Sequence, residues 1–149
     1  MFAPKNILVP TDFSKYADAA LKKAVDIATQ HDTKIYLLHV IDGQIQQCAG
    51  DYCLDYEVVK QLEKQSVKAS RDKLKKEAEG IIKAKKIKVI FDVKNGVPSE
   101  VILSEQKAKK IDLIVIASHG KTGILKQLMG SVAGKVIKGS KCPVIVVKP

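Results

Sequence analysis

The sequence predicts an α/β protein in which an open five-stranded parallel sheet carries helices on both faces. Five short apolar runs alternate along the chain with segments whose apolar residues recur at helical spacing. Several of these runs are almost continuously apolar, as expected for parallel strands that are covered on both faces. With 149 residues and no internal repeat or linker, the chain is expected to form one domain, 1–149.

The first strand is predicted at 6–10, and the first helix follows it. Ser14 is the candidate N-cap of that helix, and His31 ends it as a favourable partner of the helix dipole. The apolar face of the helix consists of Ala17, Ala20, Leu21, Ala24, Val25 and Ala28. A second buried strand is predicted next, at 34–41.

A polar loop at 43–55 precedes a long charged helix, which is predicted to run from about Tyr56 to Ala84. The apolar stripe of this helix is thin, so the helix is expected to lie on the sheet with much of its circumference in water. The stripe consists of Leu62, Ser66, Ser70, Leu74, Ala78 and Ile81.

The third and fourth strands are predicted at 89–93 and 112–116, with a helix between them. Pro98 suits the first position of that helix, which continues through Ala108. The chain then returns to the sheet through one more helix and one more strand.

The last helix is predicted at 131–138, with Gly139 as the C′ residue that ends it. The fifth strand follows at 143–147. Cys142 stands at the entrance of this strand and is expected to be a small packing residue.

The other two cysteines, Cys48 and Cys53, lie in the polar loop together with Asp51 and Asp55. A metal site or a redox pair in this loop is the alternative interpretation. The spacing C-x4-C, without a second cysteine pair or a nearby histidine, leaves a tetrahedral metal shell incomplete. We therefore predict no metal ligand and no disulfide framework.

The formal net charge is +10, and Arg71 is the only arginine among 26 basic residues. Proteins that recognise base edges rely on bidentate arginine, and single-strand binders place aromatic residues among their charges. The lysines fall mainly on predicted helices, so we interpret them as a solvated surface and expect no nucleic-acid partner. Because no apolar run approaches the ~20 residues of a membrane span and no secretory signal precedes the first strand, we expect a cytoplasmic protein without a membrane partner.

Three predicted strands end in polar or small residues that would meet at one edge of the sheet, at 10–12, 39–42 and 117–120. Ligands of open parallel sheets bind at this edge, where the strand order reverses. Nine residues follow Gly120, and Gly130-Ser131 then opens the next helix. A glycine turn and a helix start both offer backbone N–H groups to a polyphosphate, so the pattern predicts a nucleotide-binding crevice.

Together these segments resemble the universal stress protein family over essentially the whole chain. The resemblance rests on the order and spacing of the fragments rather than on any single fragment. The matching fragments are Ile7-Leu8-Val9-Pro10-Thr11-Asp12-Phe13-Ser14, Leu38-His39-Val40-Ile41-Asp42, Gly96-Val97-Pro98, the segment from Asp112 to Gly120, Gly130-Ser131-Val132 and Pro143-Val144-Ile145-Val146-Val147.

ATP-binding members of that family carry the motif G-x2-G-x9-G-[ST]. This chain matches the motif except at its first glycine, which is Ala117. An alanine keeps the position small and forbids only those backbone angles that need a glycine. The resemblance therefore implies that the chain binds ATP, with any Mg²⁺ or Mn²⁺ carried by the phosphates.

The resemblance also implies a role for each residue of the crevice. Asp12 would hydrogen-bond the ribose or the adenine, and Val40 would meet the adenine with its backbone. Pro10 and Thr11 would shape the floor. The remaining nucleotide-binding residues would be Ala117, Ser118, His119, Gly120, Gly130, Ser131 and Val132, of which the last four supply N–H donors to the phosphates.

Simpler roles remain open for several of these residues. Asp12 could cap the first helix, and Gly130-Ser131 could be an ordinary helix start. His39, flanked by apolar residues, is expected to be packed or bonded to the backbone rather than catalytic. His119 is expected to contact phosphate rather than to act as a base.

The sequence matches two other kinds of phosphate-binding protein only in part, a P-loop protein and a phospho-receiver domain. Gly120-Lys121-Thr122 resembles the tail of a P-loop, but Val115 occupies the position of its first glycine, inside a strand. A phospho-receiver domain needs clustered acidic residues at the ends of the first and third strands, and the first strand offers only Asp12. The segment 121–129, which includes Lys126, is better interpreted as a loop that closes over the phosphates.

No set of residues forms a nucleophile with its base, so no catalytic residue is predicted and any ATP hydrolysis would be slow. The resemblance implies a stress-response sensor or regulator that acts through a conformational change or an unidentified protein partner. The alternative is a dimeric stress protein that binds no nucleotide and acts through protein contacts. A dedicated nucleotide hydrolase or transferase is a third hypothesis.

The fifth strand suggests a further copy of the chain as a partner. Its apolar residues continue without a charge up to Lys148, and such an edge is a liability unless it is paired. The resemblance implies that two copies associate through Val144–Val147, giving a two-fold homodimer.

Overall fold

The computed structural model describes residues 1–43, 55–82, 85–121 and 129–149, and it confirms the predicted five-stranded parallel sheet. The strands are β1 (Asn6–Pro10), β2 (Lys34–Ile41), β3 (Val89–Asn95), β4 (Leu113–Ala117) and β5 (Val144–Val147). Their order across the sheet is β3-β2-β1-β4-β5, and all neighbouring pairs are parallel. The chain builds outward from β1 in one direction and then crosses back to add β4 on the other side. The strand order therefore reverses between β1 and β4.

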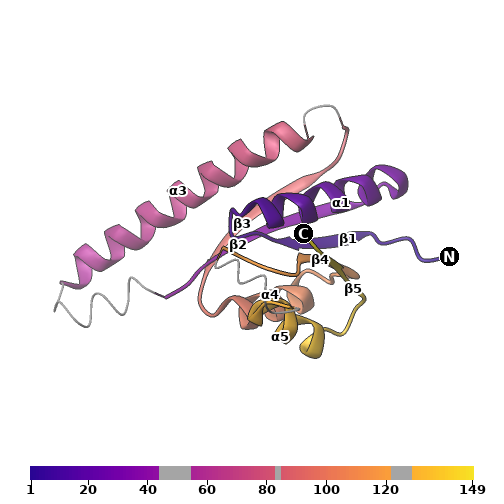
Figure 1. Ribbon diagram of the computed structural model, residues 1–149. Helices are drawn as coiled ribbons and strands as arrows, with labels where there is room; N and C mark the ends of the chain where they lie inside the picture. The colour runs from indigo at the N-terminus through magenta and orange to yellow at the C-terminus, as the bar shows by residue number, and fades with distance from the viewer. Residues whose placement is uncertain (44–54, 83–84, 122–128) are drawn as a thin grey trace.

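Helices of the described residues cover both faces of the sheet, as predicted (Figure 1). The helices are α1 (Lys15–His31), α3 (Tyr56–Ile82), α4 (Pro98–Ala108) and α5 (Ser131–Gly139). On one face, α1 and α3 pack against the sheet and form the α1/α3 layer. On the other face, α4 and α5 form the α4/α5 layer. Among the described residues, no helix combines the length and the apolar character that a membrane crossing requires.

The apolar core is divided between the two faces because alternate residues of a strand point to opposite sides. In β1, Ile7 and Val9 pack with the α1/α3 layer, whereas Leu8 packs with the α4/α5 layer. All three side chains are fully buried, which explains why this strand is apolar at every central position.

Helix α1 begins as the sequence predicts. The Oγ of Ser14 accepts a hydrogen bond from the backbone N–H of Ala17 at 3.2 Å, so Ser14 is the N-cap. His31 lies in the last turn, also as predicted. The six predicted apolar positions of this helix are all buried.

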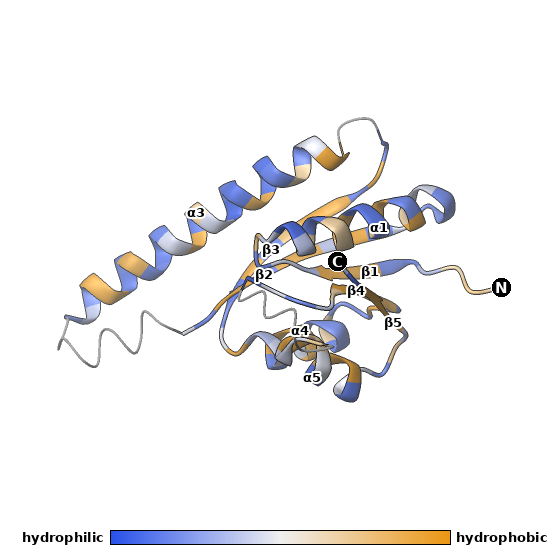
Figure 2. Ribbon diagram, in the orientation of Figure 1, coloured by the Kyte–Doolittle hydropathy of each residue, from blue (hydrophilic) through white to orange (hydrophobic). Residues whose placement is uncertain are grey.

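Helix α3 packs on the sheet through only part of its length (Figure 1). Leu74 and Ala78 are its buried residues, and both belong to the predicted stripe. Leu62, nearer the start of the helix, is 40% exposed. Most of the α3 ribbon has the colours of hydrophilic residues in Figure 2. The thin stripe thus holds the second half of α3 on the sheet, Val67 adds a half-buried contact, and the start of the helix around Tyr56, Val58 and Leu62 is exposed.

Some element boundaries differ from the prediction. Strand β3 continues to Asn95 because its pairing with β2 extends to the pair Ile41–Asn95. Strand β4 starts one residue later than predicted, at Leu113, because Asp112 instead accepts backbone N–H bonds from Lys5 at 2.9 Å and from Asn6 at 3.1 Å.

The predicted C′ role of Gly139 is wrong, because this glycine is the last residue of α5 and the extended Ser140 ends the helix. The backbone angle does not require a glycine here, but any larger residue would displace the side chain of Leu103. A Cβ at this position would lie 2.5 Å from the Cδ1 of Leu103, so α4 and α5 approach each other closely here.

Candidate functional site

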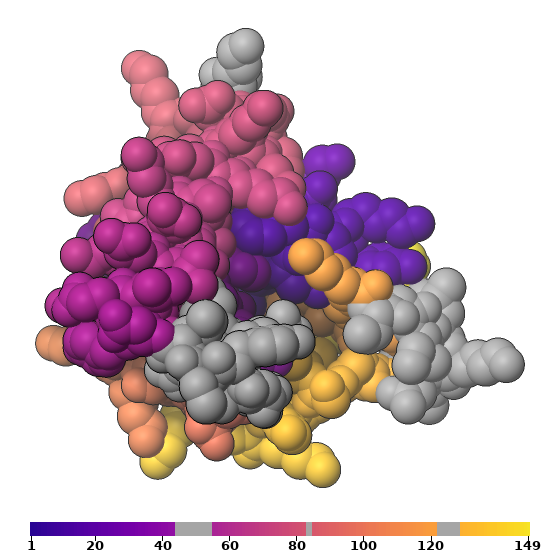
Figure 3. All heavy atoms as spheres, turned by 90° about the vertical axis from the view of Figure 1, so that its left-hand side faces the viewer, coloured from indigo at the N-terminus to yellow at the C-terminus, as the bar shows by residue number. Residues whose placement is uncertain are grey.

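The candidate site lies at the carboxyl ends of β1, β2 and β4, where the strand order reverses. The residues predicted for it follow these strands or end them: Pro10, Thr11, Asp12, Val40, Ala117, Ser118, His119 and Gly120. Figure 3 views the molecule from this end, with α3 and α1 above and α5 below. Gly130, Ser131 and Val132 come from the N-terminus of α5.

Thr11 is fixed at the end of β1 by three hydrogen bonds. Its backbone N–H donates to the carbonyl oxygen of Leu38 at 2.8 Å, and its own carbonyl oxygen lies 2.8 Å from the Nδ1 of His39. Its Oγ1 accepts from the backbone N–H of Phe13 at 3.1 Å. These bonds hold the floor of the site to β2, where Val40 is the residue after His39.

Asp12 joins the end of β1 to the turn after β4. One carboxylate oxygen accepts from the backbone N–H of Ser14 at 3.0 Å, and the other accepts from the backbone N–H of Lys121 at 2.8 Å. A Cβ at Gly120 would lie 2.5 Å from the second of these oxygens, so the position admits only a glycine without rearrangement. Asp12 thus supports the start of α1, while Ser14 remains its N-cap.

Ser118 holds the N-terminus of α5 beside the end of β4. This serine is fully buried, and its backbone N–H donates to the carbonyl oxygen of Val147 at 2.9 Å. Its carbonyl oxygen accepts from the backbone N–H of Gly130 at 2.6 Å, and a Cβ at Gly130 would lie 3.0 Å from that oxygen. The Oγ of Ser118 lies 2.8 Å from the Nδ1 of His119, which orients the imidazole ring.

Helix α5 offers backbone donors at its N-terminus. Its N-cap is Gly130, which has no side chain to accept them, and its first turn contains no acidic residue. Ser131 is exposed, and the side chain of Val132 packs against the core between the sheet and the α4/α5 layer. Free N–H groups at the positive end of a helix dipole suit an anionic ligand.

Ala117, which replaces the first motif glycine, is the last residue of β4 and pairs with Val147. Its φ is not positive, so the backbone here does not require a glycine. The alanine is therefore compatible with the local fold of this turn.

Aromatic and charged residues that sequence analysis did not assign to the site lie on its α1/α3 side. Phe13 has a φ of 65°, which is uncommon for an aromatic residue, and its ring centroid lies 4.3 Å from that of His39. The Nζ of Lys73, from α3, lies 4.4 Å from the Phe13 centroid, and that of Lys121 lies 6.0 Å from it. These contacts join segments far apart in the sequence, so no local pattern could have revealed them.

Burial lowers the pKa of His39 below its ordinary value of 6.5, and the nearby Lys121 and Lys73 lower it further. The hydrogen bond to Thr11 and the charge of Asp12 oppose this shift. The predicted role of His39, packed and bonded to the backbone, is confirmed by its contacts with Thr11 and Phe13.

A pH titration tests this environment. Because the folded-state pKa of His39 lies below 6.5, protonation favours the unfolded chain. We expect the free energy of unfolding to fall between about pH 7 and about pH 5 in the wild type, and to fall less in His39→Gln. Urea unfolding at a series of pH values measures both, and the imidazole midpoint by NMR should lie below 6.5. An equal pH dependence in the two proteins would contradict the assignment.

One of the three cysteines lies in the part of the chain that the structure describes. Cys142 is a free thiol that packs against the α4/α5 layer, as predicted. Cys48, Cys53 and Lys126 lie outside the described residues. Within the described ranges, no group of three or more metal-ligating side chains comes together.

A family model for the universal stress protein family matches residues 4–148 of this chain. Among characterised sequences, the universal stress protein MJ0531 of Methanocaldococcus jannaschii is 37% identical, over 97% of this chain and 82% of its own length. The universal stress protein MJ0577 of the same organism is 35% identical, over 97% of this chain and 94% of its own length.

Solved structures share the fold. The structure of MJ0577 has a TM-score of 0.83 at 34% identity, covering 97% of this chain and 96% of that one. Universal stress protein UspA from Lactobacillus plantarum has a TM-score of 0.80 at 25% identity, covering 99% of both chains. A universal stress protein in complex with cAMP has a TM-score of 0.68 at 20% identity, covering 99% of this chain and 98% of that one.

Proposed function

This chain belongs to the universal stress protein family, and we propose that it binds ATP, or another adenine nucleotide, at the carboxyl ends of β1, β2 and β4. The observation that carries the proposal is the contact between Gly130 and Ser118, which sets the N-terminus of α5, capped by no described side chain, beside the turn after β4. Both segments direct backbone groups to one edge of the sheet, and a polyphosphate needs such a convergence of donors.

The phosphates would bind to the N–H groups of Gly120, Ser131 and Val132, with the Ser131 hydroxyl and the His119 ring beside them. The N–H of Gly130, expected from the sequence to be a fourth donor, is instead bonded to the carbonyl oxygen of Ser118 at 2.6 Å, so Gly130 would fix the position of the other donors. Ser131 is exposed and Gly120 is half-buried, so a ligand can reach both. A divalent ion, Mg²⁺ or Mn²⁺, would be carried by the phosphates. Ala117 and Ser118 would shape the turn that holds these donors.

The nucleoside would lie on the β1 and β2 side of the crevice. Asp12 would accept a hydrogen bond from the ribose or the adenine, since a carboxylate oxygen that already takes one N–H bond retains a second lone pair. The backbone of Val40 would meet the adenine, and Pro10 and Thr11 would form the floor.

Micromolar binding of a nucleotide requires all of these contacts together. A helix N-terminus contributes about 0.3–2 kcal/mol to the binding of an anion, whereas micromolar affinity corresponds to about −8 kcal/mol. The universal stress protein from Archaeoglobus fulgidus solved with dAMP, at a TM-score of 0.56, and the protein solved with cAMP show that this fold can accommodate adenine nucleotides.

The function we infer is that of a cytoplasmic stress-response sensor rather than an enzyme. The Nδ1 of His39 is occupied by the carbonyl oxygen of Thr11, and the Nδ1 of His119 is occupied by the Ser118 hydroxyl. Neither histidine is therefore poised to activate a water through that atom. The expected output is a conformational or partner-binding change that depends on the bound nucleotide.

Mass spectrometry of small molecules released by denaturing the purified protein tests the proposal, together with calorimetric titration of the emptied protein with ATP. We expect ATP or ADP at about one per chain, or a micromolar dissociation constant. Release of no nucleotide and no heat on adding ATP would favour the alternative, a dimeric stress protein that binds no nucleotide.

We further propose that the protein forms a homodimer through the outer edge of β5. Two bonds show which residues of β5 direct their backbone groups toward β4. The Ile114 N–H donates to the Pro143 carbonyl at 3.0 Å, and the Ser118 N–H donates to the Val147 carbonyl at 2.9 Å. Because this direction alternates along a strand, the backbone groups of Val144 and Val146 face away from β4 and are free to pair with a second copy.

Val146→Pro is expected to yield monomers, because proline removes an outward N–H without breaking a bond to β4. Light scattering should give twice the chain mass for the wild type and a single chain mass for the variant. Val146→Ala is the control, since it shortens the same side chain and keeps the N–H group. A wild type that remains monomeric well above micromolar concentration would refute the dimer.

A further inference from the structure

Strand β3 forms an open edge of the sheet. It is the outermost strand beside β2, and no described strand pairs with its other side. The Ile35 N–H donates to the Lys88 carbonyl at 2.9 Å, and the Gly96 N–H donates to the Ile41 carbonyl at 3.0 Å. In a parallel ladder these two bonds fix the alternation, so Val89, Phe91 and Val93 direct their backbone N–H and C=O groups outward.

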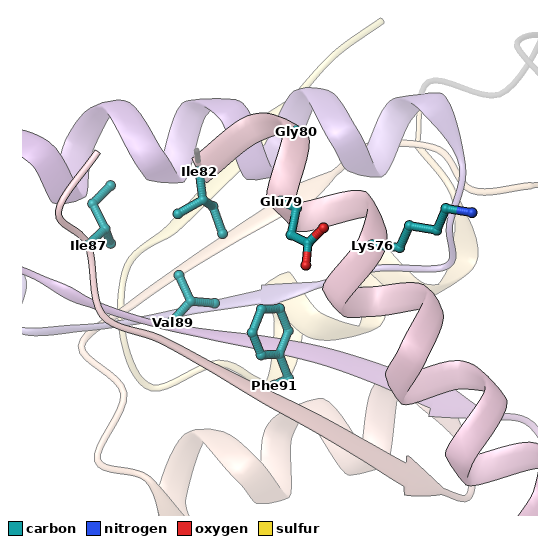
Figure 4. A pocket seen from close by; sticks show the side chains of 7 residues that line it. All are labelled: Lys76, Glu79, Gly80, Ile82, Ile87, Val89 and Phe91. Atoms are coloured by element: carbon teal, nitrogen blue, oxygen red, sulfur yellow. The ribbon is translucent and has the colours of Figure 1, made fainter. Parts of the chain in front are cut away.

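A pocket of about 520 Å³ lies between this strand and the second half of α3. This volume falls within the range of about 300–1,000 Å³ that is typical of ligand pockets. Figure 4 shows Val89 and Phe91 on the strand side, facing Ile82 and Glu79 of the helix. The lining is mainly apolar, and its two residues from β3, Val89 and Phe91, are among those whose backbone groups point away from β2.

Gly80 opens the pocket on its helical side. A glycine within a helix costs stability relative to alanine, so its presence needs a reason. Nothing lies within 4 Å of a Cβ built at this position. Packing inside the chain therefore does not require the glycine, whereas an occupant of the pocket would use the room that it leaves.

The chain that leads into β3 is positively charged. Lys86 and Lys88 are exposed, and neither forms an ion pair with any described residue. Lys76 stands at the rim of the pocket on α3. The carboxylate of Glu79 also lies on α3, across the pocket from β3. The positive charge that this carboxylate does not balance is therefore that of Lys86 and Lys88, at the start of the strand.

We propose that this groove binds an extended peptide segment of a partner protein, which adds a strand to the free edge of β3. Its main-chain groups pair with Val89, Phe91 and Val93, an apolar side chain enters the pocket, and acidic residues pass Lys86 and Lys88. A strand edge beside an apolar pocket is a known way of recognising peptides, in which the main chain supplies affinity and the pocket supplies selectivity. The groove is separate from the nucleotide crevice and does not depend on it.

The test is selection from a displayed library of random peptides of about twelve residues on the full-length protein, a length that spans strand and flanks. We expect enriched peptides in which apolar residues alternate with polar ones and acidic residues lie at one end. Hydrogen exchange with a selected peptide bound should protect the amides of Phe91 and Val93. No enrichment, or enrichment without that protection, would overturn the proposal.

Two pairs of variants locate the site. Gly80→Leu fills the pocket and should weaken a selected peptide at least about tenfold, whereas Gly80→Ala should leave its affinity within about twofold. The double variant Lys86→Glu/Lys88→Glu should weaken it about tenfold at low salt, and Lys22→Glu/Lys23→Glu on α1 provides the same charge change elsewhere. All four proteins should bind ATP as the wild type does.

Other occupants would give different results, each of which would overturn the peptide assignment. Binding of decanoate that Gly80→Leu abolishes, without peptide enrichment, would identify a pocket for a small apolar ligand. Self-association that Gly80→Leu abolishes would identify a second copy of the chain as the occupant. Equal binding of a selected peptide to Gly80→Leu and to the wild type would place the peptide elsewhere.

Discussion

Gly130→Val is expected to weaken ATP binding by at least about 100-fold, which corresponds to about 2.7 kcal/mol. A Cβ at this position already lies 3.0 Å from the carbonyl oxygen of Ser118. The two methyl groups of valine would add bulk where the phosphates approach the first turn of α5, and valine is also a poor N-cap residue. Calorimetric titration with ATP measures the loss directly.

Gly134→Ala is the matched control for this substitution. Gly134 lies in the same helix, and nothing lies within 4 Å of a Cβ built there. ATP binding should be unchanged, and the free energy of unfolding should rise by about 0.5–1 kcal/mol because alanine favours the helix. A folded Gly130→Val protein that binds ATP like the wild type would exclude the proposed phosphate position.

Leu74→Ala is expected to lower the free energy of unfolding by about 2–5 kcal/mol. Leu74 is 1% exposed and is one of the two buried residues that hold α3 on the sheet. The substitution removes a large buried side chain and leaves a cavity between α3, α1 and the sheet. Urea unfolding measures the change.

Leu62→Ala makes the same substitution in the same helix and on the same predicted stripe, but at a position that is 40% exposed. Its effect should lie within about 0.5 kcal/mol. Comparable losses in the two variants would show that the first half of α3 is packed in solution. Neither substitution touches the nucleotide site.

Local chemistry explains why much of the fold could be predicted. Ser14 was identified because a serine before a run of helical spacing has one strong role, to cap the helix. Pro98 marked the start of α4 because its fixed φ and missing N–H suit the first turn. The strand β1 was recognised because a strand covered on both faces must be apolar at successive positions.

Contacts made across the sheet explain what could not be predicted. The length of β3 depends on its pairing with β2 as far as Asn95, which no local pattern encodes. Gly139 suits the end of a helix, but in the folded chain it lies inside α5, against the side chain of Leu103 from α4. The positions of Phe13 and Lys73 beside each other likewise exist only in the folded chain.

Because α3 is held on the sheet mainly by its second half, the length of its first half can change without loss of the buried contacts. The helix has 27 residues, and at 1.5 Å per residue it measures about 40 Å, yet its buried residues Leu74 and Ala78 both lie in the second half. Whole turns can therefore be inserted or deleted before Leu62 without altering any contact in the core. Each turn would move the point where the chain enters the helix, at Tyr56, by about 5.4 Å relative to the nucleotide site. A related chain can in this way have a longer or shorter α3 on the same sheet.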